Sequence, residues 1–153
     1  MKNTTLCYLE KDGAYLMLHR TKKENDENKD KWIGIGGKLE AGETPYECAY
    51  REIFEETGLS PNSLRYRGIV TFVSDIYGTE YMHLFTTEDF SRKIKDACEE
   101  GELVWVEKSK IPTLNIWEGD KIFLSLLDTE ERFFSLKLCY EGDKLIHHKT
   151  EFK

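Results

Sequence analysis

The sequence predicts an α+β fold in which one mixed β-sheet is covered by helices. Turn residues separate pairs of β-prone runs at three places, which indicates three hairpins. Two segments with helix signals interrupt these runs, after the third and the sixth predicted strands. No repeat, low-complexity linker or domain boundary is visible, so we expect a single domain over residues 1–153.

The strands follow from short β-prone runs bounded by turn residues. Asp-Gly, Gly-Thr and Gly-Asp pairs mark the three hairpin turns, at residues 12–13, 78–79 and 142–143. Residues 21–31 are almost wholly polar and are predicted to form a surface loop. The predicted strands are Thr4–Glu10, Ala14–Arg20, Trp32–Ile35, Arg67–Tyr77, Glu80–Thr86, Glu102–Glu107, Phe133–Tyr140 and Lys144–Thr150.

The first helix carries both a start and a stop signal. Thr44 is the expected N-cap, and Glu47 completes a capping box with it. Gly58 ends the segment at a position that favours a left-handed backbone, so the sequence predicts a helix over Pro45–Thr57. A second helix is predicted near Gly119–Leu127 from the spacing of its apolar residues.

Bulk composition narrows the function classes. The formal net charge of −7 argues against stable nucleic-acid binding, because phosphate neutralisation requires basic residues. No apolar run is long enough to span a membrane, and the N-terminus does not resemble a signal peptide. The four cysteines are scattered, which argues against a zinc site or a disulfide framework. We expect a cytoplasmic protein with a small-molecule partner, and its oligomeric state is left open.

Three carboxylates of the first helix point to a metal site. Glu52, Glu55 and Glu56 are spaced i, i+3 and i+4, so they share one helical face. Such crowding is electrostatically unfavourable unless a cation neutralises it. Oxygen ligands of this kind select Mg²⁺, with Mn²⁺ able to take its place. Arg51 is placed to tether Glu55 or to reach back to Glu43.

A glycine pair precedes this helix and supplies a second feature of the candidate metal site. Gly36-Gly37 allows the backbone to approach a ligand closely, and a free carbonyl there is a further metal ligand. Lys38 is then a candidate phosphate contact. A metal held here would orient a polyphosphate and lower the pKa of an attacking water, with Glu52 as a candidate proton acceptor.

The segment from Gly37 to Leu59 resembles the Nudix box, G-x5-E-x7-R-E-U-x-E-E-x-G-U, in which U is bulky and aliphatic, and it meets each fixed position. The resemblance implies a Nudix-type α/β/α sandwich and a divalent-metal-dependent hydrolase of phosphoanhydride bonds. It also implies the roles of the box residues. The implied metal ligands are Gly36 (carbonyl), Glu52, Glu55 and Glu56, and the implied orienting pair is Arg51 with Glu43.

Members of this family often take a further acidic ligand or base from a later loop. Glu100 is the candidate here, because it precedes a glycine and the predicted strand over residues 102–107. Lys23, in the polar loop, is a candidate contact for the substrate phosphates.

Residues that recognise the rest of the substrate are expected outside the box. Trp32 through Lys38 resembles the approach to the box in MutT-like hydrolases of oxidised purine nucleoside triphosphates, and the overall layout resembles the MutX-type branch. Trp117 and Asp120 resemble the base-reading tract of the vertebrate-type enzymes, where a Trp stacks on the purine and an Asp bonds its edge. The chain departs from these enzymes at Ile33, where they carry Asn, and at Gly119, where they carry a second Asp. The implied reaction converts a purine nucleoside triphosphate such as 8-oxo-dGTP to the monophosphate and pyrophosphate.

Other substrate classes stay open at this point. Tyr77 lies near where dinucleoside-polyphosphate hydrolases place a Tyr, and removal of an RNA 5′-pyrophosphate is a further alternative. Ser74 stands where ADP-ribose hydrolases place a Pro, which disfavours that class. A non-catalytic Nudix ligand sensor is a last alternative, although such modules often lose box carboxylates that this chain retains.

Overall fold

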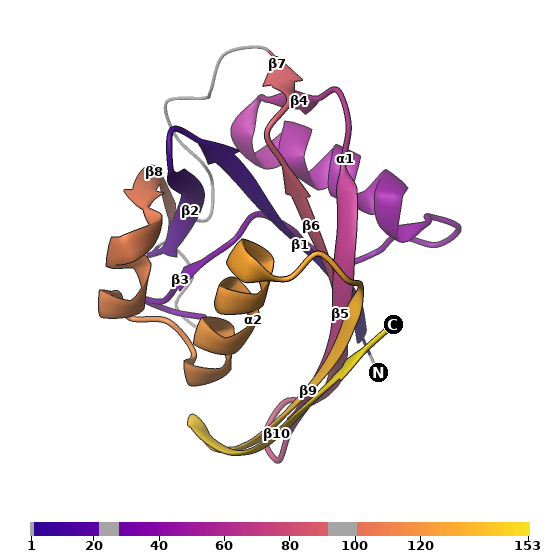
Figure 1. Ribbon diagram of the computed structural model, residues 1–153. Helices are drawn as coiled ribbons and strands as arrows, with labels where there is room; N and C mark the ends of the chain where they lie inside the picture. Colours follow the sequence, from indigo (N-terminus) through magenta and orange to yellow (C-terminus); the bar gives the residue numbers. More distant parts are fainter. Residues whose placement is uncertain (1, 22–27, 92–100) are drawn as a thin grey trace.

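The computed structural model describes residues 2–21, 28–91 and 101–153 (Figure 1). Eight strands form the main sheet in the order β10-β9-β5-β6-β1-β2-β3, with β8 also paired to β2. They are β1 (Lys2–Lys11), β2 (Ala14–Arg20), β3 (Trp32–Ile33), β5 (Arg65–Ser74), β6 (Gly78–Thr87), β8 (Gly101–Glu107), β9 (Phe134–Glu141) and β10 (Lys144–Phe152). The remaining elements are a small sheet of β4 (Ser60–Pro61) and β7 (Phe90–Ser91), helices α1 (Pro45–Thr57) and α2 (Glu118–Thr129), and a 3₁₀ helix η1 (Lys108–Thr113).

The sheet is mixed, as predicted. β1 pairs with β6, and β5 with β9, in parallel, whereas the three predicted hairpins pair antiparallel. In the first hairpin Asp12 and Gly13 have φ angles of 52° and 76°, the positive values that a tight hairpin turn needs. The second turn differs from the expectation. β6 already begins at Gly78, so the turn covers residues 75–77, where the Ser74 hydroxyl accepts backbone N–H bonds.

The two α-helices of the described chain pack on opposite faces of the sheet (Figure 1). Ala49 and Ile53 of α1 pack in one apolar core with Leu9 and Phe85 of the sheet. On the other face α2 packs in a larger core, whose fully buried side chains include Phe123. No helix in the described ranges is both long and apolar enough to cross a membrane.

The glycine-rich segment before α1 lies along β1. β1 and β2 pair at two positions beside their turn, and β2 then pairs with β8 and β3. The edge of β1 beyond that point bonds instead to residues 35–39, through Cys7 N–H to the Ile35 carbonyl (2.5 Å) and Thr5 N–H to the Gly37 carbonyl (2.9 Å). The predicted strand over Trp32–Ile35 therefore ends at Ile33, because the chain crosses there from β2 to β1.

Local signals define the ends of α1 as predicted. The Thr44 hydroxyl accepts from Glu47 N–H at 3.1 Å, and the Glu47 carboxylate accepts from Thr44 N–H at 2.9 Å. Gly58 ends the helix with φ of 78°. α2 is longer than predicted, and the buried Arg67 guanidinium donates to two carbonyls at its C-terminal end. The short elements β4, β7 and η1 were not predicted, since they are too short to show a periodicity.

Replacing Thr44 by alanine should lower the free energy of unfolding by about 1 kcal/mol, because the Glu47 N–H loses its acceptor. Urea denaturation monitored by circular dichroism measures the change. Thr44→Ser is the matched control and should keep most of the stability. Equal losses in the two variants would mean that the hydroxyl bond does not stabilise the helix.

Candidate active site

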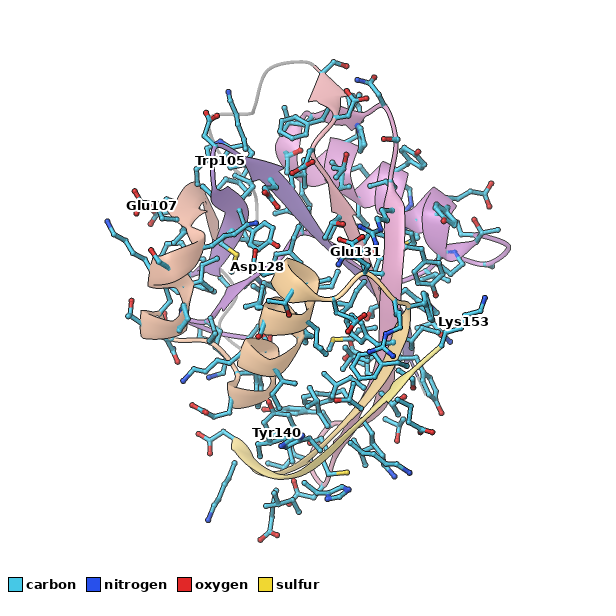
Figure 2. All side chains as sticks on the ribbon, viewed as in Figure 1. Trp105, Glu107, Asp128, Glu131, Tyr140 and Lys153 are labelled. Carbon is cyan, nitrogen blue, oxygen red and sulfur yellow. The ribbon has the colours of Figure 1, made fainter. Side chains whose placement is uncertain are left out.

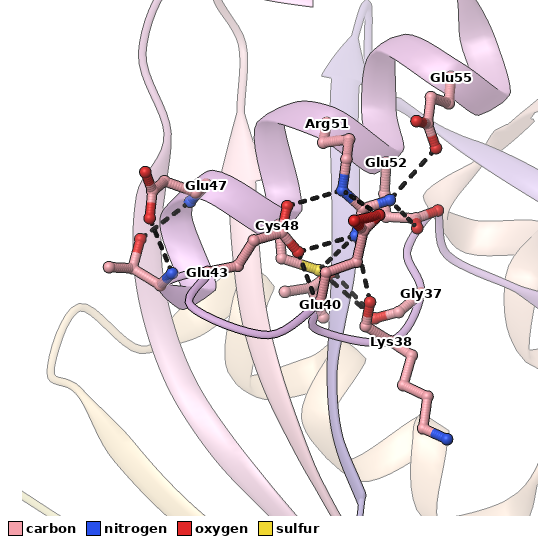
Figure 3. Close-up of polar contacts among 11 residues, drawn as sticks. Gly37, Lys38, Glu40, Glu43, Glu47, Cys48, Arg51, Glu52 and Glu55 are labelled. Carbon is pink, nitrogen blue, oxygen red and sulfur yellow. Dashed lines mark hydrogen bonds and ion pairs between the residues drawn. The ribbon is translucent and has the colours of Figure 1, made fainter.

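A bidentate ion pair joins the loop before α1 to the helix itself. Arg51 Nε donates to Glu43 Oε2 at 2.6 Å, and Arg51 Nη2 donates to Glu43 Oε1 at 2.8 Å (Figure 3). The hydrogen bonds from Arg51, with one from the Glu40 backbone, lower the pKa of Glu43 to about 2. Arg51 Nη2 also donates to the Lys38 carbonyl at 3.2 Å. The structure thus brings together the two residues predicted as an orienting pair.

The three helix carboxylates occupy the helical face that their spacing predicts, but they have different partners. Arg51 Nη1 donates to Glu52 at 2.6 Å and to Glu55 at 3.2 Å (Figure 3). Glu56 lies deeper, 9% exposed, and accepts from Gly36 N–H at 3.2 Å. Within the described residues no three Asp, Glu, His or Cys side chains form a ready-made metal cluster. Mutual repulsion explains this, since each carboxylate turns to its nearest donor.

The glycine pair lies in close contact with β1 and with Glu52. A Cβ at Gly37 would lie 2.5 Å from Glu52 Cδ, and a Cβ at Gly36 would lie 1.9 Å from the Thr5 carbonyl oxygen. A larger residue at either position would therefore collide with the strand or with the carboxylate. The Gly37 carbonyl accepts from Thr5 N–H, and the Gly36 N–H donates to the Glu56 carboxylate. Carboxylate and carbonyl oxygens are a donor set that suits Mg²⁺ or Mn²⁺.

A cavity of about 200 Å³ extends from this glycine pair to the N-terminal end of α2. Its floor is a row across β1, β6 and β5, because Lys2 pairs with Glu80, which pairs with Phe72, and Thr4 pairs with Met82. The residues that line it include Gly36, Gly37, Phe72, Met82, Trp117 and Asp120. One cavity therefore connects the glycine pair that precedes α1 with both residues predicted to read the base.

Asp120 is a buried acid at this cavity. Its side chain is 6% exposed, and burial raises its pKa to about 8, against a smaller opposing effect of Lys31. Among the described residues no group forms a hydrogen bond with its carboxyl. At neutral pH the carboxyl is thus largely protonated and offers both a donor and an acceptor to a ligand.

Trp117 lines the cavity and also packs in the core. It is 8% exposed, with ring centroids 5.6 Å from Phe72 and 5.1 Å from Tyr140 in edge-on contacts. Its Nε1–H donates to Asn28 at 2.8 Å, which fixes the ring plane. Trp32, by contrast, stacks on His19 at 4.5 Å and does not line the cavity.

Packing explains why glycine stands at position 119. The Tyr140 hydroxyl accepts from Gly119 N–H at 2.7 Å, and Tyr140 lies beside the N-terminal end of α2 (Figure 2). A Cβ at Gly119 would lie 2.5 Å from Leu138 Cδ1 and 2.8 Å from that hydroxyl. A second aspartate beside Asp120 would therefore require the Leu138 and Tyr140 side chains to shift.

Other predicted residues lie elsewhere. The exposed Lys38 side chain points away from the carboxylates and does not line the cavity (Figure 3). Lys23 and Glu100 fall outside the described residues. Tyr77, 42% exposed, lies in the β5–β6 turn. Arg20, which the sequence analysis missed, lines the cavity, and its place at the end of the second predicted strand was the available signal.

The NUDIX domain model matches residues 2–127. The chain belongs to the Nudix family. An oxidized purine nucleoside triphosphate hydrolase of Danio rerio is 31% identical over 123 residues, covering 79% of this chain and 78% of that protein. The Mus musculus protein of the same name is 32% identical over 105 residues, covering 67% of this chain and 66% of that protein.

The fold agrees with this family. A crystal structure of a MutT protein from Bacillus halodurans superposes with a TM-score of 0.88 at 24% identity, covering 99% of this chain and 98% of that one. The predicted Nudix-type sandwich with a mixed sheet is therefore confirmed. The protein is a Nudix hydrolase, and such hydrolases generally use divalent metal ions.

Asp120 should give the fold a distinctive pH dependence. Between about pH 4 and 8 the folded protein holds a proton that the unfolded chain has released, so burial of Asp120 lowers stability as pH rises. Asp120→Asn cannot ionise, and its stability relative to wild type should rise by up to about 1.4 kcal/mol per pH unit in this window. Urea denaturation at pH 5, 6, 7 and 8 measures the difference.

The matched control for this titration is Asp143→Asn, at an exposed turn position. Its stability profile should run parallel to that of wild type. A parallel profile for Asp120→Asn as well would show that Asp120 ionises normally in the folded protein.

Proposed function

We propose that the enzyme hydrolyses purine nucleoside triphosphates, with 8-oxo-dGTP favoured, to the nucleoside monophosphate and pyrophosphate, and so clears oxidised nucleotides from the pool. The observation that carries the proposal is the single cavity that joins Gly36 and Gly37 to Trp117 and Asp120. A nucleotide lying in it would place its base at α2 and its phosphates at the acidic face of α1.

The base end of the cavity suits a purine. Phe72, Met82 and Trp117 supply apolar and aromatic walls, and the largely protonated Asp120 offers a donor and an acceptor to the base edge. The names of the relatives from Danio rerio and Mus musculus support an oxidised purine as the substrate. Because Ile33 lines the same cavity where an amide stands in the vertebrate-type enzymes, Asp120 supplies the polar contacts at this end.

At the phosphate end, Gly36, Glu52, Glu55 and Glu56 would hold Mg²⁺, for which Mn²⁺ can substitute. The bound metal would supply charge neutralisation and activation of the attacking water. Arg51 and Glu43 hold the loop in register with the helix, and Glu52 accepts the proton of the water. Arg20, which lines the cavity, is a cationic contact for the phosphates. Lys38, whose exposed side chain would have to turn toward the site, and Lys23 are further candidate phosphate contacts. Glu100 keeps the role of acidic ligand or base that the family resemblance implies.

The organisation of the protein follows the same proposal. Residues 1–153 form one catalytic domain, which acts in the cytoplasm on free nucleotides and does not bind nucleic acid stably. The net charge of −7 supports this, because extended phosphate contacts need a basic surface.

A nucleotide panel in ¹⁸O-water tests the assignment. Plain and oxidised purine triphosphates, a dinucleoside polyphosphate and an RNA 5′-triphosphate are incubated with Mg²⁺, and the products are separated by ion exchange. We expect 8-oxo-dGTP to give the highest kcat/KM, with a monophosphate and pyrophosphate as products. The label enters the monophosphate if the α-phosphorus is attacked and pyrophosphate if the β-phosphorus is attacked. Preference for the dinucleotide or the RNA end would overturn the assignment.

Glu56→Gln should lower kcat by roughly 10³-fold, because an amide is a poor ligand for a hard cation. The amide oxygen can still accept from Gly36 N–H, so the fold should persist. Titration with Mn²⁺ followed by electron paramagnetic resonance should show weaker metal binding. Glu47→Gln, on the same helix but in the capping box, is the control and should retain turnover. Normal turnover and Mn²⁺ affinity in Glu56→Gln would remove Glu56 from the site.

A further inference from the structure

One buried hydroxyl has no partner. Among the side chains that the structure describes, Tyr8 Oη is the one fully buried polar atom without a hydrogen bond. Tyr8 is 0% exposed, and its ring packs against Tyr15 and Phe123 at centroid distances of 5.4 and 6.1 Å. A phenylalanine would fill the same space without burying an unpaired hydroxyl. Packing alone therefore does not account for the hydroxyl.

The hydroxyl lies behind Gly34, a residue that lines the cavity proposed to bind the nucleotide. Thr4 and Leu6 line the cavity, and Tyr8 is the next residue on the same face of β1. Gly34, which also lines the cavity, is so close that a Cβ there would lie 2.8 Å from Tyr8 Cζ. A larger residue at position 34 would thus collide with the end of the ring that bears the hydroxyl.

Asp120 lies one helical turn before Phe123, against which the Tyr8 ring packs at 6.1 Å, so Asp120 is on the face of α2 that packs toward Tyr8. Its charge is close enough to raise the pKa of Tyr8, although burial is the larger cause. The Gly34 N–H also approaches the phenol oxygen, and it acts to lower that pKa without reaching hydrogen-bond geometry. Because the Gly34 N–H approaches the oxygen as a donor, the hydroxyl's own proton remains available to donate to another group. Within the described structure the carboxyl of Asp120 likewise has no hydrogen-bond partner.

We propose that Tyr8 is a positioning residue for base recognition, whose O–H donates to the Asp120 carboxyl when a purine fills the cavity. The bond orients the carboxyl toward the base edge, so Tyr8 acts through Asp120 and does not itself touch the substrate. It supplies the support that a neighbouring aspartate would otherwise give, since this chain carries glycine at position 119. This inference rests on the proposed function.

Tyr8→Phe tests the inference, because it removes the hydroxyl and keeps the ring. Calorimetric titration with 8-oxo-dGMP, without metal, measures base binding apart from the chemistry at α1. We expect Tyr8→Phe to weaken binding by about 10-fold, the effect of losing one hydrogen bond to a polar group. KM for 8-oxo-dGTP should rise by a similar factor, and kcat should fall far less. Tm should stay at or above that of wild type.

Two further comparisons separate positioning from packing. In the Asp120→Ala background, Tyr8→Phe should change the Kd less than twofold, because the group that it positions is gone. Tyr15→Phe removes a hydroxyl from the neighbouring ring, which does not line the cavity, and should leave the Kd within twofold of wild type. A Kd for Tyr8→Phe within twofold of wild type, or an equal loss in both backgrounds, overturns the role of Tyr8 alone. Failure of wild type to bind or hydrolyse any purine nucleotide overturns the proposed function with it.

Discussion

The close approach of residues 34–37 to β1 is the constraint on which the whole site depends. The strand leaves no room for a side chain at Gly36, where a Cβ would lie 1.9 Å from the Thr5 carbonyl oxygen. This contact exists because β2 separates from β1 after two residue pairs and leaves the edge of β1 to the glycine segment. The same segment leads into α1 and lines the cavity, so one packing contact places the acidic helix and the base pocket relative to each other.

Charge at the acidic face is offset only in part within the protein, because Arg51 brings one positive charge to several glutamates. Arg51 donates to Glu43, Glu52 and Glu55, and Glu56 accepts from a backbone N–H. These partners offset the repulsion that three carboxylates within little more than one helical turn would otherwise create. A divalent ion bound as proposed at this face would compete with Arg51 for Glu52, so its affinity would include the free energy of breaking that contact. The bidentate bond to Glu43 keeps Arg51 beside the helix when this happens.

At the other end of the cavity, burial keeps the Asp120 carboxyl largely protonated at neutral pH. Asp120 and the Tyr8 hydroxyl are buried without hydrogen-bond partners among the described residues, an arrangement that lowers stability. Apolar residues at both positions would favour the folded state. Their retention in a pocket lined by Phe72 and Trp117 is typical of a site where stability is given up for recognition.

The sequence by itself determined the features that depend on neighbours in the chain. The capping box and Gly58 define both ends of α1, the Asp12-Gly13 turn defines the first hairpin, and the spacing of the glutamates defines the shared acidic face. Hydrogen bonds and sterics within a few residues decide each of these. The family resemblance supplied the residue roles, which geometry alone would not have assigned.

Only the tertiary structure decided how distant segments meet. Contacts between residues far apart in sequence decide three features: the end of the third strand at Ile33, the close packing of Leu138 and Tyr140 on Gly119, and the cavity between the glycine pair and α2. In the sequence, Tyr8 has the pattern of an ordinary core residue of a β-strand. Its buried hydroxyl is seen to lack a hydrogen bond only in the folded structure, where Gly34 packs against the ring. Burial and close approach depend on the whole packed chain, so a local pattern does not reveal them.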